Sequence, residues 1–245
     1  MLTQQDLKLL GQKGISESQI EAQLECFKKG FPFLNIQSAA TIGNGILSID
    51  ENEAEKYLNI WNNYLEKNHK IVKFVPASGA ASRMFKNLFE FLGASYDTPT
   101  NNFEKSFFKQ IKSFAFYSDL NETCLKNEGK DIDKLLVEGK YKTIIENLLS
   151  ENGMNYGALP KGMLKFHYPQ TDRTAMEEHL AEGALYARNK AGNVNVHFTV
   201  SHEHLPYFQK LVIEKQPEYE KEYGVKYHIS FSEQKPSTDT IAADM

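Results

Sequence analysis

The stretch Ile71-Val-Lys-Phe-Val75, continued by Pro76-Ala-Ser-Gly-Ala-Ala-Ser82 and then by Arg83-Met-Phe-Lys-Asn-Leu-Phe-Glu-Phe-Leu92, decides the fold. Its first part is short, apolar and rich in β-branched residues, which is typical of a buried strand. Its second part is a run of small residues after a proline, which indicates a loop. Its third part has the apolar spacing of a helix. We therefore expect a strand, a short loop and a helix in direct succession.

Two further strands are predicted towards the carboxyl terminus. Residues 194–200 alternate apolar with polar side chains, and alternation with period two indicates a strand buried on one side. Residues 227–231 repeat the pattern, and a brief strand is expected over residues 164–167. Strands that alternate with helices through short connections indicate a largely parallel sheet. The expected fold class is α/β, with a three-layer, mostly parallel sheet.

Helices are predicted between these strands. Thr174-Ala-Met-Glu177 is a capping box, in which two side chains each satisfy a backbone N–H at the start of a helix. Ser201 is expected to cap a second helix, and residues 103–150 indicate helices with a loop over residues 121–131. The aromatic residues of this stretch are expected to form a helix core rather than a base-stacking platform: Phe103, Phe107, Phe108, Phe114, Phe116 and Tyr117.

The first 70 residues indicate a helical segment. Two start signals, Thr3-Gln-Gln-Asp6 and Ser16-Glu-Ser-Gln19, place a side-chain oxygen where it can accept from an orphan backbone N–H. A turn-rich interval over residues 30–45 follows, and a third helix pattern comes after it. We expect this segment to pack as a helical appendage.

Composition narrows the class of protein. The chain has 245 residues, with 28 Lys and Arg against 32 Asp and Glu, and a net charge of −4. This charge argues against general electrostatic binding to nucleic acid or anionic lipid. No apolar run reaches the roughly 20 residues of a membrane span, and the amino terminus lacks the pattern of a signal peptide. Cys26 and Cys124 are too few for a disulfide framework. We expect a cytoplasmic protein with neither nucleic acid nor membrane as a partner; the oligomeric state is left open.

The loop after the first strand carries the clearest chemical signal. Ala77, Ser78, Gly79, Ala80, Ala81 and Ser82 are all small, so their backbone N–H groups are accessible where a helix is expected to begin. Such a turn can cradle a phosphate, and the guanidinium of Arg83 adds donors that suit phosphate oxygens. The alternative is close packing of strand on helix that tolerates only small residues.

A second loop, Leu159-Pro-Lys-Gly-Met163, contains a lysine that could also bind a phosphate. Pro160 fixes its own backbone angle and Gly162 relaxes the following turn, so Lys161 is expected to lie in a shaped loop. Its ammonium group could neutralise charge on a phosphate. The alternative is an exposed loop lysine without a specific role.

The two loops together carry a resemblance to a known family. Residues 75–84 resemble the Leu-Ala-Gly-Gly-x-Gly-Thr-Arg-Leu loop of sugar nucleotidyltransferases, although Ser78 and Ala81 stand where that family has glycines. Pro160-Lys-Gly-Met163 resembles the Pro-Lys-Gly-Met of UDP-N-acetylhexosamine pyrophosphorylases, and Phe231-Ser-Glu-Gln234 resembles their strand-end segment near the nucleotide. The chain is similar to a bacterial domain-of-unknown-function family related to these enzymes.

The resemblance implies a fold and a division of the chain. It implies a GT-A, or nucleotide-diphospho-sugar transferase-like, sheet. Residues 1–70 would then be a helical segment, and residues 71–245 a partial nucleotidyltransferase-like domain with a helical insertion at about residues 95–155. In the family the acidic metal ligand and most of the sugar pocket lie downstream of the position of Met245, so we expect this chain to correspond to the first part of such an enzyme.

The resemblance also implies an activity. It implies transfer of a nucleotidyl group from an NTP, with UTP expected, to a sugar 1-phosphate, with release of pyrophosphate and with Mg²⁺ as cofactor. Residues 77–82, Gly162 and Gln234 would bind the nucleotide and the sugar phosphate. Arg83 and Lys161 would be catalytic, and the metal ligands are not assigned. Two alternatives stay open: a non-catalytic nucleotide-sugar-binding or glycosyltransferase-like domain, and an inert structural domain.

The histidines do not indicate a metal site. His202 and His204 flank Glu203, but residues two apart on a helix point to different faces. The other histidines considered lack a partner at metal-ligand spacing: His167, His179, His197 and His228.

Overall fold

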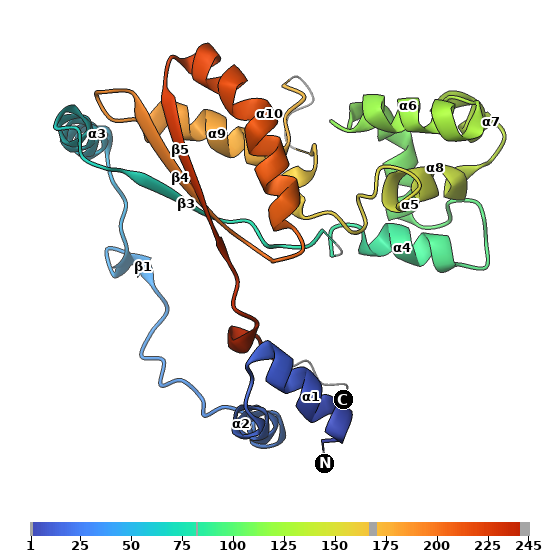
Figure 1. Ribbon diagram of the computed structural model, residues 1–245, viewed down its shortest axis with the longest axis horizontal. Coiled ribbons are helices and arrows are strands. Elements are labelled where there is room, and N and C mark those ends of the chain that lie inside the picture. The colour runs from blue at the N-terminus through green and yellow to red at the C-terminus, as the bar shows by residue number, and fades with distance from the viewer. Residues whose placement is uncertain (1, 82, 167–170, 241–245) are drawn as a thin grey trace. The chain divides into compact units, whose positions relative to one another are not determined.

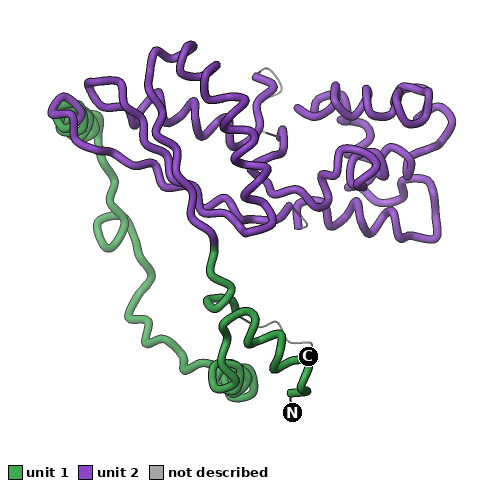
Figure 2. The backbone as a smooth tube through the Cα atoms, in the orientation of Figure 1, with its two compact units in different colours: residues 1–64, 234–245 green, residues 65–233 purple. Residues whose placement is uncertain are grey.

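The computed structural model describes residues 2–81, 83–166 and 171–240. The backbone divides into two units, one of residues 1–64 with 234–245 and one of residues 65–233 (Figure 2). The division falls at residues 64 and 65, ahead of the position expected from the sequence, and the carboxyl-terminal residues are grouped with the first unit.

The first unit contains helices and two short strands. Its helices begin at the expected caps: the side chains of Thr3 and Ser16 accept from the N–H groups of Asp6 and Gln19, and both capping boxes are complete. Helix α3 continues into the second unit. The elements are α1 (Gln4–Lys13), α2 (Glu17–Lys29), β1 (Thr41–Ile42), β2 (Gly45–Ile46), α3 (Glu51–Glu66) and the 3₁₀ turn η3 (Pro236–Thr238).

A parallel sheet organises the second unit (Figure 1). Its strands are β3 (Val72–Pro76), β4 (Asn193–Val200) and β5 (Lys226–Glu233), in the order β3-β4-β5 and parallel throughout. These three predicted strands are confirmed. The strand expected over residues 164–167 is wrong for Leu164–Phe166, which have no regular structure; His167 lies outside the described residues.

Two helices, α9 (Ala175–Tyr186) and α10 (Leu205–Tyr223), pack on one face of this sheet. On that face Phe198 of β4 lies against Phe208 of α10, with ring centroids 6.1 Å apart. On the other face Phe74 is 63% exposed. The three-layer expectation is therefore corrected: within the described part of residues 65–233, helices cover one face of the sheet.

The helix starts on this face differ in how well the sequence predicts them. The capping box of Thr174 and Glu177 is present at the start of α9. Helix α10 begins at Leu205 with His204 as its N-cap, so the expected cap at Ser201 is wrong. The Ser201 hydroxyl instead lies 2.9 Å from Nδ1 of His204, inside the turn that precedes the helix.

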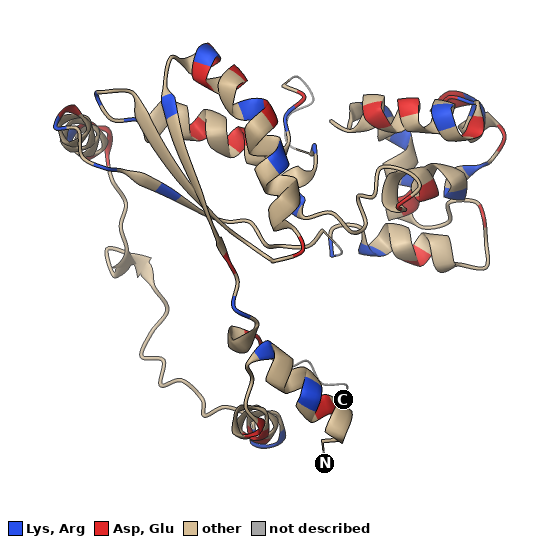
Figure 3. Cartoon of the chain, viewed as in Figure 1, with Lys and Arg blue, Asp and Glu red and all other residues tan. Residues whose placement is uncertain are grey.

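The helices between β3 and residue 150 build a separate core. The predicted aromatic core is confirmed in Phe107, Phe108 and Phe116, which are buried, whereas Phe103 is exposed. Acidic and basic residues are interspersed along these helices (Figure 3). They are α4 (Lys86–Gly93), α5 (Asn102–Lys109), the 3₁₀ turn η1 (Ile111–Ser113), α6 (Tyr117–Glu128), α7 (Ile132–Val137) and α8 (Tyr141–Leu149).

Two boundaries in this helical part differ from expectation. Helix α4 begins at Lys86 rather than Arg83, because the N–H groups of Met84 and Phe85 both turn back to the carbonyl oxygen of Ala81. Helix α6 continues through most of the expected loop, and the Asn121 side chain accepts from the N–H of Ile132 at the start of α7. Among the described residues, no helix combines the length and the apolar character needed to span a bilayer.

Candidate functional site

The two loops singled out in the sequence meet in the structure. The N–H of Lys161 donates to the carbonyl oxygen of Gly79 across 3.0 Å, and Ala80 and Pro160 form an isolated antiparallel bridge. Lys161 begins the short 3₁₀ turn η2 (Lys161–Met163). Both contacts are made by the backbone, so the local chain shape holds the loops together whatever side chain stands at position 161.

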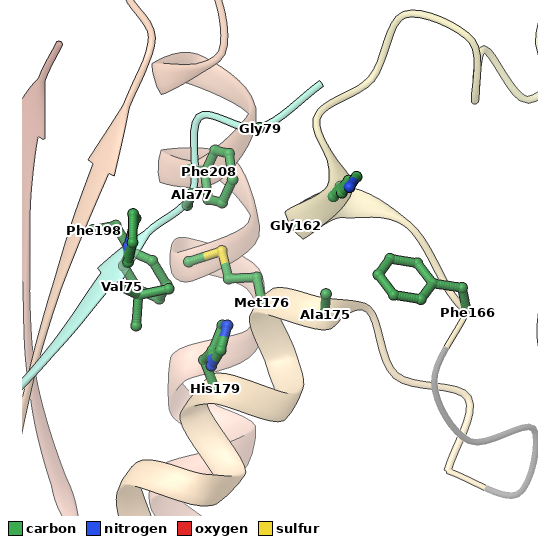
Figure 4. A pocket seen from close by; sticks show the side chains of 12 residues that line it. Val75, Ala77, Gly79, Gly162, Phe166, Ala175, Met176, His179, Phe198 and Phe208 are labelled. Carbon is green, nitrogen blue, oxygen red and sulfur yellow. The ribbon is translucent and has the colours of Figure 1, made fainter. Parts of the chain in front are cut away.

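A pocket of about 220 Å³ opens beside these loops. It lies where β3 ends and where α9 and the first turns of α10 begin (Figure 4). Carboxyl ends of strands in open α/β sheets are the usual place for ligands. Most of the wall is apolar, and the side chains of Lys161 and His179 bring charge or polarity to it. Its lining is Val75, Pro76, Ala77, Gly79, Lys161, Gly162, Phe166, Ala175, Met176, His179, Phe198 and Phe208.

The small-residue loop is fixed at both ends. The N–H of Ala77 donates to the carbonyl oxygen of Thr199 across 2.8 Å, and Ala81 is fully buried in the core of the helical part. Ala81 thus fits the packing interpretation of this loop. Among the described residues, no hydrogen bond engages the N–H groups of Ser78, Gly79 and Ala80. The middle of the loop can therefore present donors to an anion.

The structure brings some of the predicted site residues to the pocket and leaves others outside its lining. Ala77, Gly79, Lys161 and Gly162 line it. Ser78, Ala80 and Ala81 belong to the same loop without lining the pocket, and Ser82 lies outside the described residues. Arg83 is exposed in the turn before α4 and is not part of the lining, and Gln234 follows β5 as the first residue of its segment in the first unit.

Gly162 has a packing reason to be glycine. A Cβ atom at this position would lie 2.6 Å from Cζ and 2.8 Å from Cε1 of Phe208, closer than real Cβ contacts. Gly79 is different, because a Cβ there would meet nothing within 4 Å. The first glycine shapes the pocket wall through Phe208, and the second leaves the loop backbone open.

Sequence reasoning missed a network of polar side chains beside the pocket. Glu182 of α9 accepts from Lys73 of β3, from the Tyr186 hydroxyl at 3.0 Å, and from Nδ1 of His179 at 3.2 Å. Burial alone would raise the pKa of Glu182, but its hydrogen bond and charge interaction with Lys73, followed by the hydrogen bonds from Tyr186 and His179, lower it. The signal in the sequence was the i, i+3 spacing of His179 and Glu182 on one helix face.

The described residues do not offer a ready metal centre. They contain no group of three or more His, Cys, Asp or Glu side chains that could hold an ion, and no carboxylate lines the pocket. His202 instead pairs with Glu233 at 2.9 Å, and this hydrogen bond together with the charge of Glu233 raises the pKa of His202. The residues described around the pocket therefore do not fit the Mg²⁺ that the resemblance implies.

Comparison with known proteins gives a family for nearly the whole chain. The family model described as "Domain of unknown function (DUF4301)" matches residues 3–245. No curated protein and no solved structure matches the chain. The resemblance to sugar nucleotidyltransferases gains no support from these comparisons and stays a prediction.

Proposed function

This chain belongs to the DUF4301 family, and we propose that it is a nucleotidyltransferase-like protein. In this proposal it binds an NTP, with UTP as the first substrate to test, and transfers the nucleotidyl group to a sugar 1-phosphate with release of pyrophosphate. The observation that carries the proposal is the hydrogen bond between Lys161 and Gly79, which joins a small-residue loop to a lysine at one pocket. A GT-A type of sheet is part of the same proposal.

The phosphates would lie at the end of the pocket formed by the two loops. Backbone N–H groups of residues 78–80 supply donors, and the ammonium group of Lys161 neutralises negative charge. Lys161 is exposed, so its side chain can reach a phosphate that extends out of the pocket. Arg83 is exposed as well. In the role expected for it, its guanidinium group would attract the leaving pyrophosphate.

The apolar interior suits the ring of a base or sugar. A cavity of about 150 Å³ holds one benzene molecule, and this pocket measures about 220 Å³. Ligand sites commonly span roughly 300–1,000 Å³, so the pocket accommodates one part of a nucleotide. The phosphates would then lie towards solvent, next to the two loops.

The proposed reaction needs no protein nucleophile. A phosphate oxygen of the sugar 1-phosphate attacks the α-phosphorus of UTP and forms the new P–O bond. The bond from the α-phosphorus to the oxygen that bridges to the β-phosphorus breaks, and its electron pair leaves with pyrophosphate. The protein positions both substrates and stabilises charge, and the preorganised ammonium of Lys161 supplies that stabilisation. Because the described residues do not fit Mg²⁺, no protein ligand is assigned to the ion.

A second function, binding of a nucleotide sugar without turnover, is favoured by one observation. Among the described residues that line the pocket there is no carboxylate to organise a metal around the phosphates, and Lys161 is the only lysine or arginine. A protein of this kind would bind UTP or a UDP-sugar and release no pyrophosphate. The inert structural domain stays as the third alternative and would bind neither.

Pyrophosphate release separates these functions. The assay follows UTP with a panel of sugar 1-phosphates and compares the wild type with Lys161→Ala, Arg83→Ala and the control Lys86→Ala. Lys86 is an exposed lysine of α4 outside the pocket lining. We expect Lys161→Ala to lower kcat by about 100-fold and Arg83→Ala mainly to raise KM. Activity with an unchanged kcat in Lys161→Ala would contradict the role of Lys161, and UTP binding without release would favour the second function.

A further inference from the structure

Four side chains from β3 and α9 form one connected network at the pocket wall. Lys73 donates to Glu182 and to the Tyr186 hydroxyl, the latter at 2.7 Å, and its Nζ lies 4.9 Å from the centre of the Tyr186 ring. Glu182 also accepts from Tyr186 and from Nδ1 of His179. Only His179 of the four lines the pocket, so the network ends on the pocket wall.

This network is held in place by charge. The side chain of Lys73 is 11% exposed, and a nearly buried ammonium group is stable only beside a partner of opposite charge. Glu182 is that partner, and it is fixed in turn because Lys73 and Tyr186 both bond to it. A fixed carboxylate that accepts from Nδ1 sets both the tautomer and the orientation of a histidine ring.

His179 lies apart from the phosphate-binding loops. Figure 4 shows its ring on the side of Met176 that faces away from Gly79, and Val75 lines the same pocket. A ligand with its phosphates at Gly79 and Lys161 would therefore place its ring system towards His179. The other pocket residues at this end are apolar.

We propose that His179 is a ligand-positioning residue that contacts the base or sugar ring, and that Glu182, Lys73 and Tyr186 hold its ring in the required orientation. This inference rests on the proposed function, because it assumes that a nucleotide occupies the pocket. It adds the recognition of the non-phosphate part of the ligand, a role that neither the sequence motifs nor the family resemblance assigns to these residues.

The test compares two probes by titration calorimetry. UTP carries a base and a sugar as well as the phosphates, whereas inorganic tripolyphosphate carries only the phosphates. For His179→Ala we expect UTP affinity to fall about 10-fold, the scale of one lost hydrogen bond or ring contact, and tripolyphosphate affinity to stay unchanged. His179→Gln, which keeps a polar side chain, should recover part of the loss. The matched control is His228→Ala, because His228 lies exposed on β5 and bonds to Asn193 outside the pocket.

The outcomes separate this inference from the proposed function. If the wild type binds UTP and His179→Ala binds it equally well, the inference is wrong and the phosphate site stands. If the variant loses affinity for UTP and for tripolyphosphate in the same proportion, His179 is only structural and the inference is again wrong. If the wild type binds neither probe, the proposed function fails and this inference fails with it. Should His179→Ala not fold, Tyr186→Phe removes one hydrogen bond to Glu182, and a roughly threefold loss confined to UTP is expected.

Discussion

The backbone N–H of Lys161 donates to the carbonyl oxygen of Gly79 across 3.0 Å, and this bond brings two loops that are distant in sequence to one pocket. Because the bond does not involve the lysine side chain, the position of the loop and the charge it carries can be changed separately. Replacement of the side chain removes the ammonium group and keeps the bond.

Lys161→Ala should weaken nucleotide binding without loss of stability. The exposed ammonium group attracts a bound phosphate and so contributes to nucleotide affinity. The same exposed side chain contributes little to the stability of the fold. We expect UTP affinity to fall about 10-fold, as for the loss of a charge-assisted hydrogen bond, and the free energy of unfolding to change by less than about 0.5 kcal/mol. Calorimetry and urea denaturation measure the two quantities. Lys86→Ala is the control and should change neither, and unchanged UTP affinity in Lys161→Ala would count against the site.

Gly162→Ala should destabilise the protein through Phe208. The added Cβ would lie 2.6 Å from Cζ of a ring that is fully buried, so either the loop or the ring must move. Overpacking of this kind costs about 1–3 kcal/mol. Urea denaturation of Gly162→Ala measures the cost. Gly93→Ala is the matched control, because a Cβ there meets nothing within 4 Å; equal stability of the two variants would show that the contact with Phe208 is not tight.

The stabilising contribution of Glu182 should depend on pH. Its folded pKa lies below the ordinary value of 4.5, because the interactions with Lys73, Tyr186 and His179 outweigh the effect of burial. A lowered pKa means that the carboxylate stabilises the fold above pH 4.5 and that this stabilisation is lost as the pH falls through the folded pKa. The difference in unfolding free energy between the wild type and Glu182→Gln should therefore be largest near pH 6 and shrink towards pH 3. A difference that stays constant over this range would contradict the charged network.

Glu104→Ala should destabilise the helical part of the second unit. The carboxylate of Glu104, a residue that is 2% exposed, accepts from the Thr100 N–H at 2.6 Å, from the Tyr96 hydroxyl at 2.9 Å and from the side-chain amide of Asn101 at 2.7 Å. Its removal leaves these donors without their acceptor and should cost about 3 kcal/mol. Thermal and urea denaturation measure the loss. Glu122→Ala, at an exposed position of α6, should stay within about 0.5 kcal/mol of the wild type.

Local signals in the sequence predicted local structure well. The capping boxes at Thr3, Ser16 and Thr174 are formed between residues three apart, so the sequence contains both partners side by side. The predicted starts of α4 and α10, which have no capping box, are wrong. Helix α4 begins after the turn formed at Ala81, and no side chain caps it at Phe85.

The three-layer expectation was wrong, although the strand sequences indicate how many faces of the sheet are covered. Strands of a parallel sheet that is covered on both faces read as nearly continuous apolar runs. Residues 193–200 instead alternate between buried and half-buried positions, and in β5 His228 and Ser230 are exposed between more buried neighbours. Alternation of this kind indicates one covered face, which is the arrangement found for the described residues.

The site depends on contacts between residues that are remote in sequence. The composition of each loop indicated phosphate chemistry, but only the folded chain shows that Ala80 and Pro160 are bridged. The role of His179 was missed for the same reason. Its neighbour Glu182 is visible in the helix pattern, whereas the charge that fixes Glu182 comes from Lys73 on β3.

The central claim is that the loop of residues 77–81 binds the phosphates of a nucleotide, and amide chemical shifts of the ¹⁵N-labelled protein test it most directly. UTP, and tripolyphosphate in a parallel titration, are added with Mg²⁺ present. The account predicts that the largest shifts fall on the N–H signals of Ser78, Gly79, Ala80 and Lys161 with both ligands, and that signals near His179 shift with UTP alone. No shift at millimolar UTP, or shifts confined to residues away from the two loops, would contradict the account.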